Sequence, residues 1–274
     1  MISLREGNCG FGAVIVKEGH LIAKAHDEEK TAEDATAHAE ITAIKKASAQ
    51  LGRDLSECIL VSTHEPCPMC ATAMLWSGIS ELAYGCSIKE ALAQGRKRID
   101  LPCKVIYARA GKEIISHQDI LKAECAVLYD SAVRDHIEQL RQADQNQLEK
   151  LAHELSAKRL KWFTDHRSIY SSAGQDILET AYRVFLDKIG ITAAEAPIVR
   201  RDPKRLVLHS KNDCPTLEAC NILGLDTRFV CRHLTEKPTT RLLRQIHSKL
   251  RFTRNYDRLR PQCDYCEEMI VLDD

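Results

Sequence analysis

The first half of the chain alternates short apolar runs with helical patterns, and this order most restricts the fold that the chain can adopt. Phe11 to Val16 and His20 to Ala25 are two apolar runs, and the short Lys17 to Gly19 segment between them is typical of a hairpin turn. The later expected elements are a helix, a strand, a helix and two strands, at residues 37–51, 58–63, 69–77, 81–85 and 104–108, with a short helix between the last two strands. Strands that alternate with helices predict a layered α/β domain whose sheet is partly parallel.

The length allows a second domain. A chain of 274 residues with 44% hydrophobic side chains can bury two ordinary cores. A polar helical stretch runs from about Gln118 to Lys161, and we place the domain boundary within it, near Ala143. Beyond it, a strand-like run from Leu206 to Ser210 precedes a helical pattern from Cys214 to Gly224. The sequence therefore predicts an α/β domain over residues 1–143 and an α+β domain over residues 144–274.

Charge and hydropathy exclude some classes of function. The 39 basic and 39 acidic side chains cancel, which disfavours a role that depends on long-range attraction to RNA. No apolar run is long enough for a membrane span, so we expect no membrane partner. The first residues lack the pattern of a secretory signal, which favours the cytoplasm. In that reducing compartment the twelve cysteines are expected to be metal ligands, nucleophiles or small buried side chains.

Four residues of the first half have the spacing of a catalytic metal site. Cys67 and Cys70 form a Cys-x-x-Cys at the expected start of a helix, where both sulfurs can face one point. His38, near the start of another expected helix, would be the third ligand of a zinc ion. Three protein ligands leave a tetrahedral zinc one position for water, which is typical of catalytic sites. Glu40, two residues after His38, can then move protons between that water and a substrate without binding the metal.

The order of these residues, His-x-Glu followed by Pro-Cys-x-x-Cys, resembles the cytidine deaminase superfamily. The likeness extends over roughly Gly10 to Ala108 and is strongest to its guanine deaminase and tRNA adenosine deaminase branch. It implies a three-layer, cytidine-deaminase-like mixed sheet flanked by helices, a zinc cofactor, a homodimer, and attack by zinc hydroxide with Glu40 as the proton shuttle and ammonia as a product. It also implies substrate contacts, which by position fall on Phe11, Asp27, Ala39 and Pro66. Asp27 departs from the usual asparagine, and an ionised aspartate only accepts hydrogen bonds, so it would favour substrate N–H groups and repel phosphate. The alternatives are that Asp27 is a solvated turn residue and that Phe11 packs in the core.

The second half resembles the L-2-amino-thiazoline-4-carboxylate hydrolase family over about 65 residues. The likeness rests on the Cys-Pro-x-x-Glu-Ala run that begins at Cys214, on Cys231, and on the Cys-Asp-aromatic run that begins at Cys263. Cys214 could be a nucleophile at a helix start, or Cys214, Cys231, Cys263 and Cys266 could form a second metal site. A third interpretation is that these cysteines are small hydrophobic side chains of a core. The sequence does not decide whether this domain is catalytic, ligand-binding or structural.

A basic segment with interleaved aromatics, Arg241 to Arg260, is the one feature that favours RNA. Solvated helix faces often have the same composition, so RNA remains the weaker alternative. The leading hypothesis is a zinc-dependent hydrolytic deaminase of a free aminated heterocycle, such as guanine, cytosine or an analogue. Its alternatives are a tRNA adenosine deaminase and a non-enzymatic, zinc-stabilised ligand-binding protein.

Overall fold

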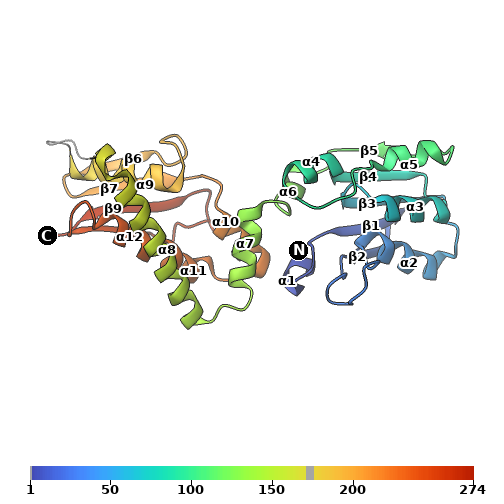
Figure 1. Cartoon of the computed structure of the whole chain (residues 1–274), viewed down its shortest axis with the longest axis horizontal. Helices are drawn as coiled ribbons and strands as arrows, with labels where there is room; N and C mark the ends of the chain where they lie inside the picture. The colour runs from blue at the N-terminus through green and yellow to red at the C-terminus, as the bar shows by residue number, and fades with distance from the viewer. Residues whose placement is uncertain (1, 171–175) are drawn as a thin grey trace. The chain divides into compact units, whose positions relative to one another are not determined.

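The computed structural model describes residues 2–170 and 176–274. They form two compact units, Met1–Glu138 and Gln139–Asp274 (Figure 1). The division falls within helix α7, a few residues before the boundary expected near Ala143. Each unit is built on its own sheet.

The first unit contains a mixed five-stranded sheet with the order β2-β1-β3-β4-β5. Its elements are α1 (Ile2–Glu6), β1 (Gly12–Lys17), β2 (His20–His26), α2 (Ala39–Leu51), β3 (Cys58–His64), α3 (Pro68–Ser77), β4 (Glu81–Cys86), α4 (Ile88–Ala93), α5 (Cys103–Arg109), β5 (Ile115–His117), α6 (Lys122–Ala126) and α7 (Ser131–Leu140). Strand β1 is antiparallel to β2 and β3, whereas β3, β4 and β5 are parallel. The predicted hairpin and the mixed, helix-flanked sheet are therefore confirmed.

Alternating burial along the strands decides which face of this sheet forms the core. Ala13 and Ile15 of β1 and Leu60 of β3 are buried, whereas their sequence neighbours are partly exposed. Helix α2 packs against β1 and β2, and α3 packs against α2 and α5. On this arrangement the starts of α2 and α3 come close to the carboxyl end of β3, where the predicted metal ligands lie.

One predicted strand is wrong. Residues 104–108 belong to helix α5, because Cys103 and Tyr107 lie one helical turn apart and both are buried. The buried carboxylate of Glu65 also accepts a hydrogen bond from the backbone N–H of Cys103, at the start of this helix. The strand that pairs with β4 is instead the short, exposed β5, which the sequence pattern did not indicate.

The second unit is an α+β arrangement around a four-stranded antiparallel sheet with the order β6-β7-β9-β8, as predicted. Its elements are α8 (Gln145–His166), η1 (Arg167–Tyr170), α9 (Ile177–Ile189), β6 (Ile198–Asp202), β7 (Arg205–Ser210), α10 (Pro215–Leu223), α11 (Thr227–Cys231), η2 (Arg232–Glu236), α12 (Lys237–Leu243), β8 (Leu250–Arg254) and β9 (Cys266–Leu272). Its core lies between the sheet and helices α9 and α12. Phe185 of α9 stacks on Phe252 of β8, with 5.2 Å between the ring centres.

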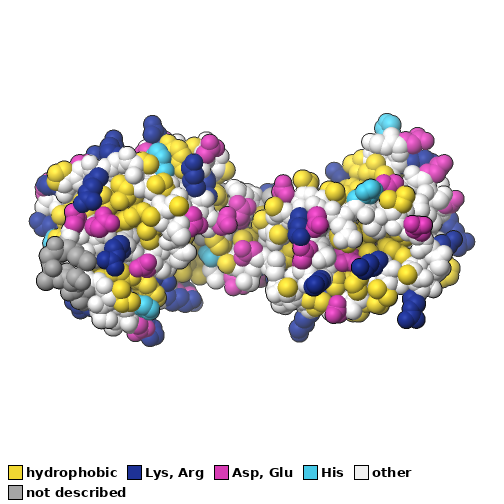
Figure 2. Space-filling model, turned by 90° about the horizontal axis from the view of Figure 1, so that it is seen from above, with side chains coloured by type: hydrophobic (Ala, Val, Ile, Leu, Met, Phe, Trp, Pro, Cys, Tyr) yellow, Lys and Arg dark blue, Asp and Glu magenta, His cyan; other side chains and the backbone are white. Residues whose placement is uncertain are grey.

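The surface of both units carries interspersed charges of both signs (Figure 2). This distribution agrees with the balanced composition of the chain. Among the described residues, no helix combines the length and the apolar character that crossing a bilayer requires.

Candidate active site

The two cysteines and the histidine of the motif lie just before, or in the first turn of, two helices. His38 precedes α2 and Cys67 precedes α3, and both have extended backbone angles, with ψ of 152° and 168°. Pro68 occupies the first position of α3, where its fixed backbone angle suits a helix start. The helix dipole at such a start stabilises negative charge on the sulfur of Cys67.

These three side chains converge with distances that suit zinc. His38 Nδ1 lies 3.5 Å from the Sγ atoms of both Cys67 and Cys70, and the two sulfurs are 3.6 Å apart. A tetrahedral zinc ion with standard bond lengths would separate its sulfur ligands by about 3.8 Å and each sulfur from a nitrogen by about 3.6 Å. The donor set and its spacing therefore fit a zinc ion that keeps a fourth position for a non-protein ligand.

The electrostatics of the triad also suit a metal. Hydrogen bonds from Cys70 and His38 lower the pKa of the Cys67 thiol to about 4, so this sulfur is a thiolate at neutral pH. The other ring nitrogen of His38, Nε2, lies 4.0 Å from a carboxylate oxygen of Glu29. A carboxylate near the second nitrogen of a ligating histidine favours the tautomer whose Nδ1 binds metal.

Glu40 lies beside this triad and is only 5% exposed. Its Oε1 accepts a hydrogen bond from Ser62 Oγ at 3.3 Å, and its Oε2 lies 3.6 Å from Cys70 Sγ. Burial raises the pKa of the Glu40 carboxyl. A carboxyl with a raised pKa can both accept and return a proton near neutral pH.

A small cavity of about 50 Å³ opens onto His38 and Cys67 of the triad and onto Glu40. It is lined by Cys9, Phe11, Asp27, Glu29, His38, Glu40, His64, Glu65, Cys67 and Arg98. The expected substrate residues Phe11 and Asp27 are therefore part of its wall. Ala39 and Pro66 are buried but are not among the lining residues, so their expected substrate contacts stay a prediction.

Asp27 is held in the cavity wall by the backbone around it. Its side chain is almost fully buried, and its Oδ1 accepts a hydrogen bond from the backbone N–H of Cys9 at 3.3 Å. Cys9, Asp27 and Glu29 also bring their ligating atoms within 4.8 Å of one another. The wall of the cavity therefore places two side-chain carboxyl groups, those of Asp27 and Glu29, beside the metal triad.

Arg98 adds a cation to the same cavity. Its guanidinium carbon lies 4.7 Å from the centre of the Phe11 ring, and its Nε donates to His64 Nε2 at 3.2 Å. The other nitrogen of His64, Nδ1, lies 3.0 Å from the carbonyl oxygen of Cys86, so it carries the proton. Burial, assisted by Arg98 and Arg96, lowers the pKa of His64 to about 4. A neutral His64 therefore orients Arg98.

The motifs missed several of these residues. Cys9, Glu29, Glu65 and Arg98 line the cavity, yet none belongs to the His-x-Glu or Pro-Cys-x-x-Cys pattern. Glu29 lies two residues after Asp27 and could have been found by the same alignment. Arg98 lies in a loop after α4, and no local pattern connects it to the site.

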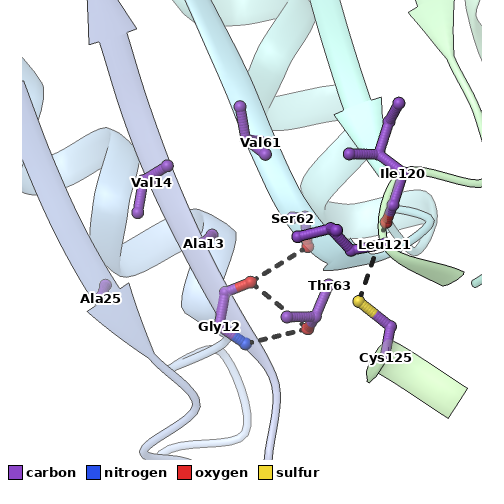
Figure 3. Close-up of a pocket in the computed structure, with 10 residues that line it drawn as sticks. All are labelled: Gly12, Ala13, Val14, Ala25, Val61, Ser62, Thr63, Ile120, Leu121 and Cys125. Carbon is purple, nitrogen blue, oxygen red and sulfur yellow. Dashed lines mark hydrogen bonds between the residues drawn. The ribbon is translucent and has the colours of Figure 1, made fainter. Parts of the chain in front are cut away.

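A second, larger pocket of about 280 Å³ lies elsewhere on the first unit (Figure 3). Its walls come from β1, β2 and β3 and from the segment around Ile120 and Cys125, and Val14 and Val61 are paired neighbours on its strands. The drawn polar contacts, such as Thr63 Oγ1 with the backbone of Gly12, already join protein groups to one another (Figure 3). This pocket offers an apolar surface and no group suited to hydrolysis.

The structure does not bring three of the cysteines of the second unit within 4.8 Å of one another, as far as the described residues show. Within the described ranges, the groups of three or more potential ligands with mutual distances under 4.8 Å all lie in the first unit. The thiol of Cys263 donates to the carbonyl oxygen of Tyr265 at 2.9 Å, whereas Cys231 and Cys266 are buried. The second metal site considered for Cys214, Cys231, Cys263 and Cys266 therefore stays a prediction.

Most side chains of the basic segment form ion pairs or hydrogen bonds within their own unit. Arg251, Arg254 and Arg258 form ion pairs with Asp273, Glu268 and Glu267. Arg241 donates to Ser156 Oγ, and Arg260 donates to the carbonyl oxygen of Asn212. The segment is therefore not a continuous row of unpaired cations, which weakens its value as an RNA-binding feature.

Comparison with known families agrees with this geometry. Residues 3–86 match the cytidine and deoxycytidylate deaminase zinc-binding region. The first unit thus contains a zinc-binding domain of this deaminase family, and the resemblance and the zinc cofactor inferred from the sequence are confirmed. The likeness of the second half to thiazoline-carboxylate hydrolases stays a prediction.

Individual relatives of the first unit are named deaminases. The chain is 43% identical over 101 residues to guanine deaminase from Bacillus subtilis, covering 34% of this chain and 65% of that protein. It is 42% identical over 83 residues to a tRNA-specific adenosine deaminase from Aquifex aeolicus, covering 30% of this chain and 55% of that protein. Among solved structures, the guanine deaminase from Nitrosomonas europaea aligns with a TM-score of 0.42 and 27% identity, over 47% of this chain and 75% of that one. The chain therefore spans only about half to two thirds of the length of these two sequence relatives.

Proposed function

We propose that the first unit is a zinc-dependent hydrolytic deaminase that acts on a free aminated heterocycle, such as guanine, cytosine or an analogue. The observation that carries this proposal is the convergence of His38, Cys67 and Cys70 at zinc-ligand distances with the buried carboxyl of Glu40 beside them. A purely structural zinc site would need no carboxylate there, which speaks against a non-enzymatic binding protein. Named deaminases among the relatives support the same class of reaction.

His38, Cys67 and Cys70 would hold the zinc ion. When bound, zinc lowers the pKa of a water molecule and so supplies the nucleophile at neutral pH. Glu40 would take up the first proton of that water and deliver it to the ring nitrogen of the substrate. It would then take the second proton, from the added hydroxyl that becomes the carbonyl oxygen of the product, and pass it to the departing amine. Its raised pKa suits both directions of transfer. Ammonia and the corresponding oxo-heterocycle are the products.

The cavity wall supports a free heterocycle over a phosphorylated one. Asp27 and Glu29 would accept hydrogen bonds from substrate N–H groups and repel a phosphate. Arg98, oriented by His64, would donate to a carbonyl oxygen or a ring nitrogen. An RNA substrate would bring phosphates near these two carboxylates. Arg251, Arg254 and Arg258 of the basic segment are paired with acidic residues of their own unit, so this segment gives RNA little support.

The experiment is an ammonia-release assay on the zinc-loaded full chain, with free bases, nucleosides and an anticodon stem-loop RNA as substrates. Glu40→Gln should retain one zinc per chain, measured by atomic emission, and lower kcat at least about 100-fold, since general acid–base groups typically contribute that much. Glu57→Gln, on an exposed strand-end glutamate, is the matched control and should keep full activity. Equal activity of the Glu40→Gln variant would refute the mechanism.

The substrate panel separates the alternatives. Ammonia from at least one free base, and none from RNA, would support the proposal. Release from the stem-loop alone would identify a tRNA adenosine deaminase instead. No release from any substrate by a zinc-loaded chain would favour the binding-protein hypothesis.

We also propose that the protein acts in the cytoplasm as a homodimer. None of the twelve cysteines forms a disulfide in the structure, which supports a reducing compartment. The homodimer rests on the family resemblance alone. Sedimentation of the purified chain would test it directly.

A further inference from the structure

Arg98 lies in the loop between α4 and α5 and is fixed in the wall of the cavity. Its Nε donates to Nε2 of His64 at 3.2 Å, and its Nη1 donates to the carbonyl oxygen of Lys97 at 2.9 Å. Its guanidinium carbon also lies 4.7 Å from the centre of the Phe11 ring, at cation–π distance. These contacts hold the guanidinium in place before a ligand arrives, so little side-chain entropy is lost when a ligand binds it.

One donor nitrogen of this guanidinium remains available to a ligand. Among the described residues, Nη2 of Arg98 has no hydrogen-bond partner. The side chain is partly exposed and lines the cavity, so a ligand in the cavity can reach it. A guanidinium stays charged at neutral pH and only donates hydrogen bonds. This part of the wall therefore suits a ligand atom that accepts a hydrogen bond.

Asp27 and Glu29 provide the complementary groups in the same cavity. Asp27 is only 2% exposed, and its Oδ1 accepts a hydrogen bond from the backbone N–H of Cys9. As far as the structure describes the chain, its Oδ2 has no hydrogen-bond partner. An ionised carboxylate only accepts hydrogen bonds. A ligand in this cavity thus meets a free acceptor on Asp27 and a free donor on Arg98.

A lactam, the cyclic amide –NH–C(=O)–, is the ring group that matches this pair. Its N–H can donate to a carboxylate, and its carbonyl oxygen can accept from a guanidinium. Guanine and cytosine each combine a lactam with the ring amine that a hydrolytic deaminase removes, whereas adenine has an amine and no carbonyl oxygen. The free groups of the wall therefore favour bases of the guanine and cytosine type over adenine.

We propose that Arg98 is a specificity-determining residue, which selects aminated heterocycles that carry a lactam by donating from Nη2 to the lactam oxygen. This inference rests on the proposed deaminase function and narrows its substrate class. An analogue without the oxygen leaves the charged donor without a partner in the cavity, and sites built to bond a polar group reject such analogues. Because a hydrogen bond to a charged group is a strong one, the lactam should be favoured about 10- to 100-fold.

Two pairs of compounds that differ in this oxygen test the role of Arg98. Guanine is paired with 2-aminopurine, which keeps the amine and lacks the oxygen, and cytosine is paired with 4-aminopyrimidine in the same way. Equilibrium dialysis measures the dissociation constant of each compound with the zinc-loaded Glu40→Gln chain, in which turnover is blocked. Ammonia release by the zinc-loaded natural chain gives kcat/KM for the same compounds.

We expect at least one lactam base to bind at least about tenfold more tightly than its analogue. The further change Arg98→Met, which keeps an unbranched side chain and removes its donors, should abolish this preference. Arg109→Met, on an exposed arginine of α5, is the matched control and should keep it. Equal binding of base and analogue, a preference that Arg98→Met leaves unchanged, or no binding of either lactam base would overturn the proposal.

The two assays separate the role of Arg98 from the deaminase function itself. Ammonia release without a preference for the lactam would overturn the role of Arg98 and leave the deaminase function standing. A preference in binding that depends on Arg98, without ammonia release from any compound, would support the role of Arg98 and contradict the deaminase function.

Discussion

The buried, neutral His64 predicts a specific dependence of stability on pH. Burial, followed by repulsion from Arg98, lowers its pKa from 6.5 to about 4. Between these two values the unfolded chain binds a proton that the folded chain excludes, so the free energy of unfolding falls as the pH decreases from about 6.5 to about 4. A shift of this size corresponds to about 3 kcal/mol.

His64→Gln removes the titrating group and keeps its contacts. The amide can accept from Arg98 and donate to the carbonyl oxygen of Cys86, as the neutral imidazole does. On acidification from pH 6.5 to pH 4, the free energy of unfolding of the variant should therefore fall by about 3 kcal/mol less than that of the natural protein. The direction of this difference follows from the lowered pKa, because a histidine that resists protonation in the folded state destabilises the protein on acidification.

Urea unfolding of the zinc-loaded chain at a series of pH values would measure this difference. Circular dichroism follows both units, and Trp162 fluorescence identifies the transition of the second unit, so the remaining transition belongs to the first. His20→Gln, on an exposed histidine of β2, is the matched control. Parallel stability curves for His64→Gln and the natural protein would refute the assignment of a neutral, buried His64.

Three further outcomes follow from the packing of the first unit. Gly85→Ala should destabilise the first unit by about 1–3 kcal/mol in urea unfolding, since the new Cβ would lie 2.4 Å from Cys125 Sγ. Gly12→Ala is its control and should be tolerated, because a Cβ at Gly12 would make only an ordinary contact at 3.8 Å. Glu65→Ala should lower the free energy of unfolding by about 2–6 kcal/mol, because the two carboxylate oxygens of Glu65 accept the backbone N–H groups that begin α4 and α5. In the variant both N–H groups would be buried and unpaired. A loss below 1 kcal/mol would contradict this. Removal of zinc with a chelator should lower the unfolding temperature of the first unit and leave the Trp162 transition in place; a shift of both transitions would show that the units do not unfold separately.

The elements of the first unit were predictable where burial has a simple period. Strand β3 alternates buried and partly exposed residues throughout, and Gly78 ends α3 in a left-handed conformation that glycine favours. The strand predicted for residues 104–108 was wrong because a β-branched, apolar run fits a strand as well as a helix. The decision came from contacts distant in sequence, namely the carboxylate of Glu65 at the helix start. The exposed β5 has too few residues to show any period.

The candidate site divides in the same way. His38, Cys67 and Cys70 could be predicted because their relation is set by local spacing at the starts of helices. Arg98 could not, since its place depends on the loop after α4 returning to the cavity and on the proton position of His64. The burial of Arg254 could not be predicted either, because the sequence shows a basic segment but not which of its members is buried.

The zero net charge of the chain acquires a different meaning once each unit is considered by itself. In the first unit, the cavity beside the metal triad has the carboxylates of Asp27 and Glu29 and the guanidinium of Arg98 in its wall, so it offers a ligand both acceptors and a donor. In the second unit, Arg251, Arg254 and Arg258 pair with Asp273, Glu268 and Glu267, so charges of opposite sign are matched locally. Neutrality over the whole chain therefore excludes neither cationic nor anionic ligands. What selects a ligand is the charge left unpaired within a few ångströms of each site, because salt screens exposed charges beyond about 10 Å and screens buried ones much less.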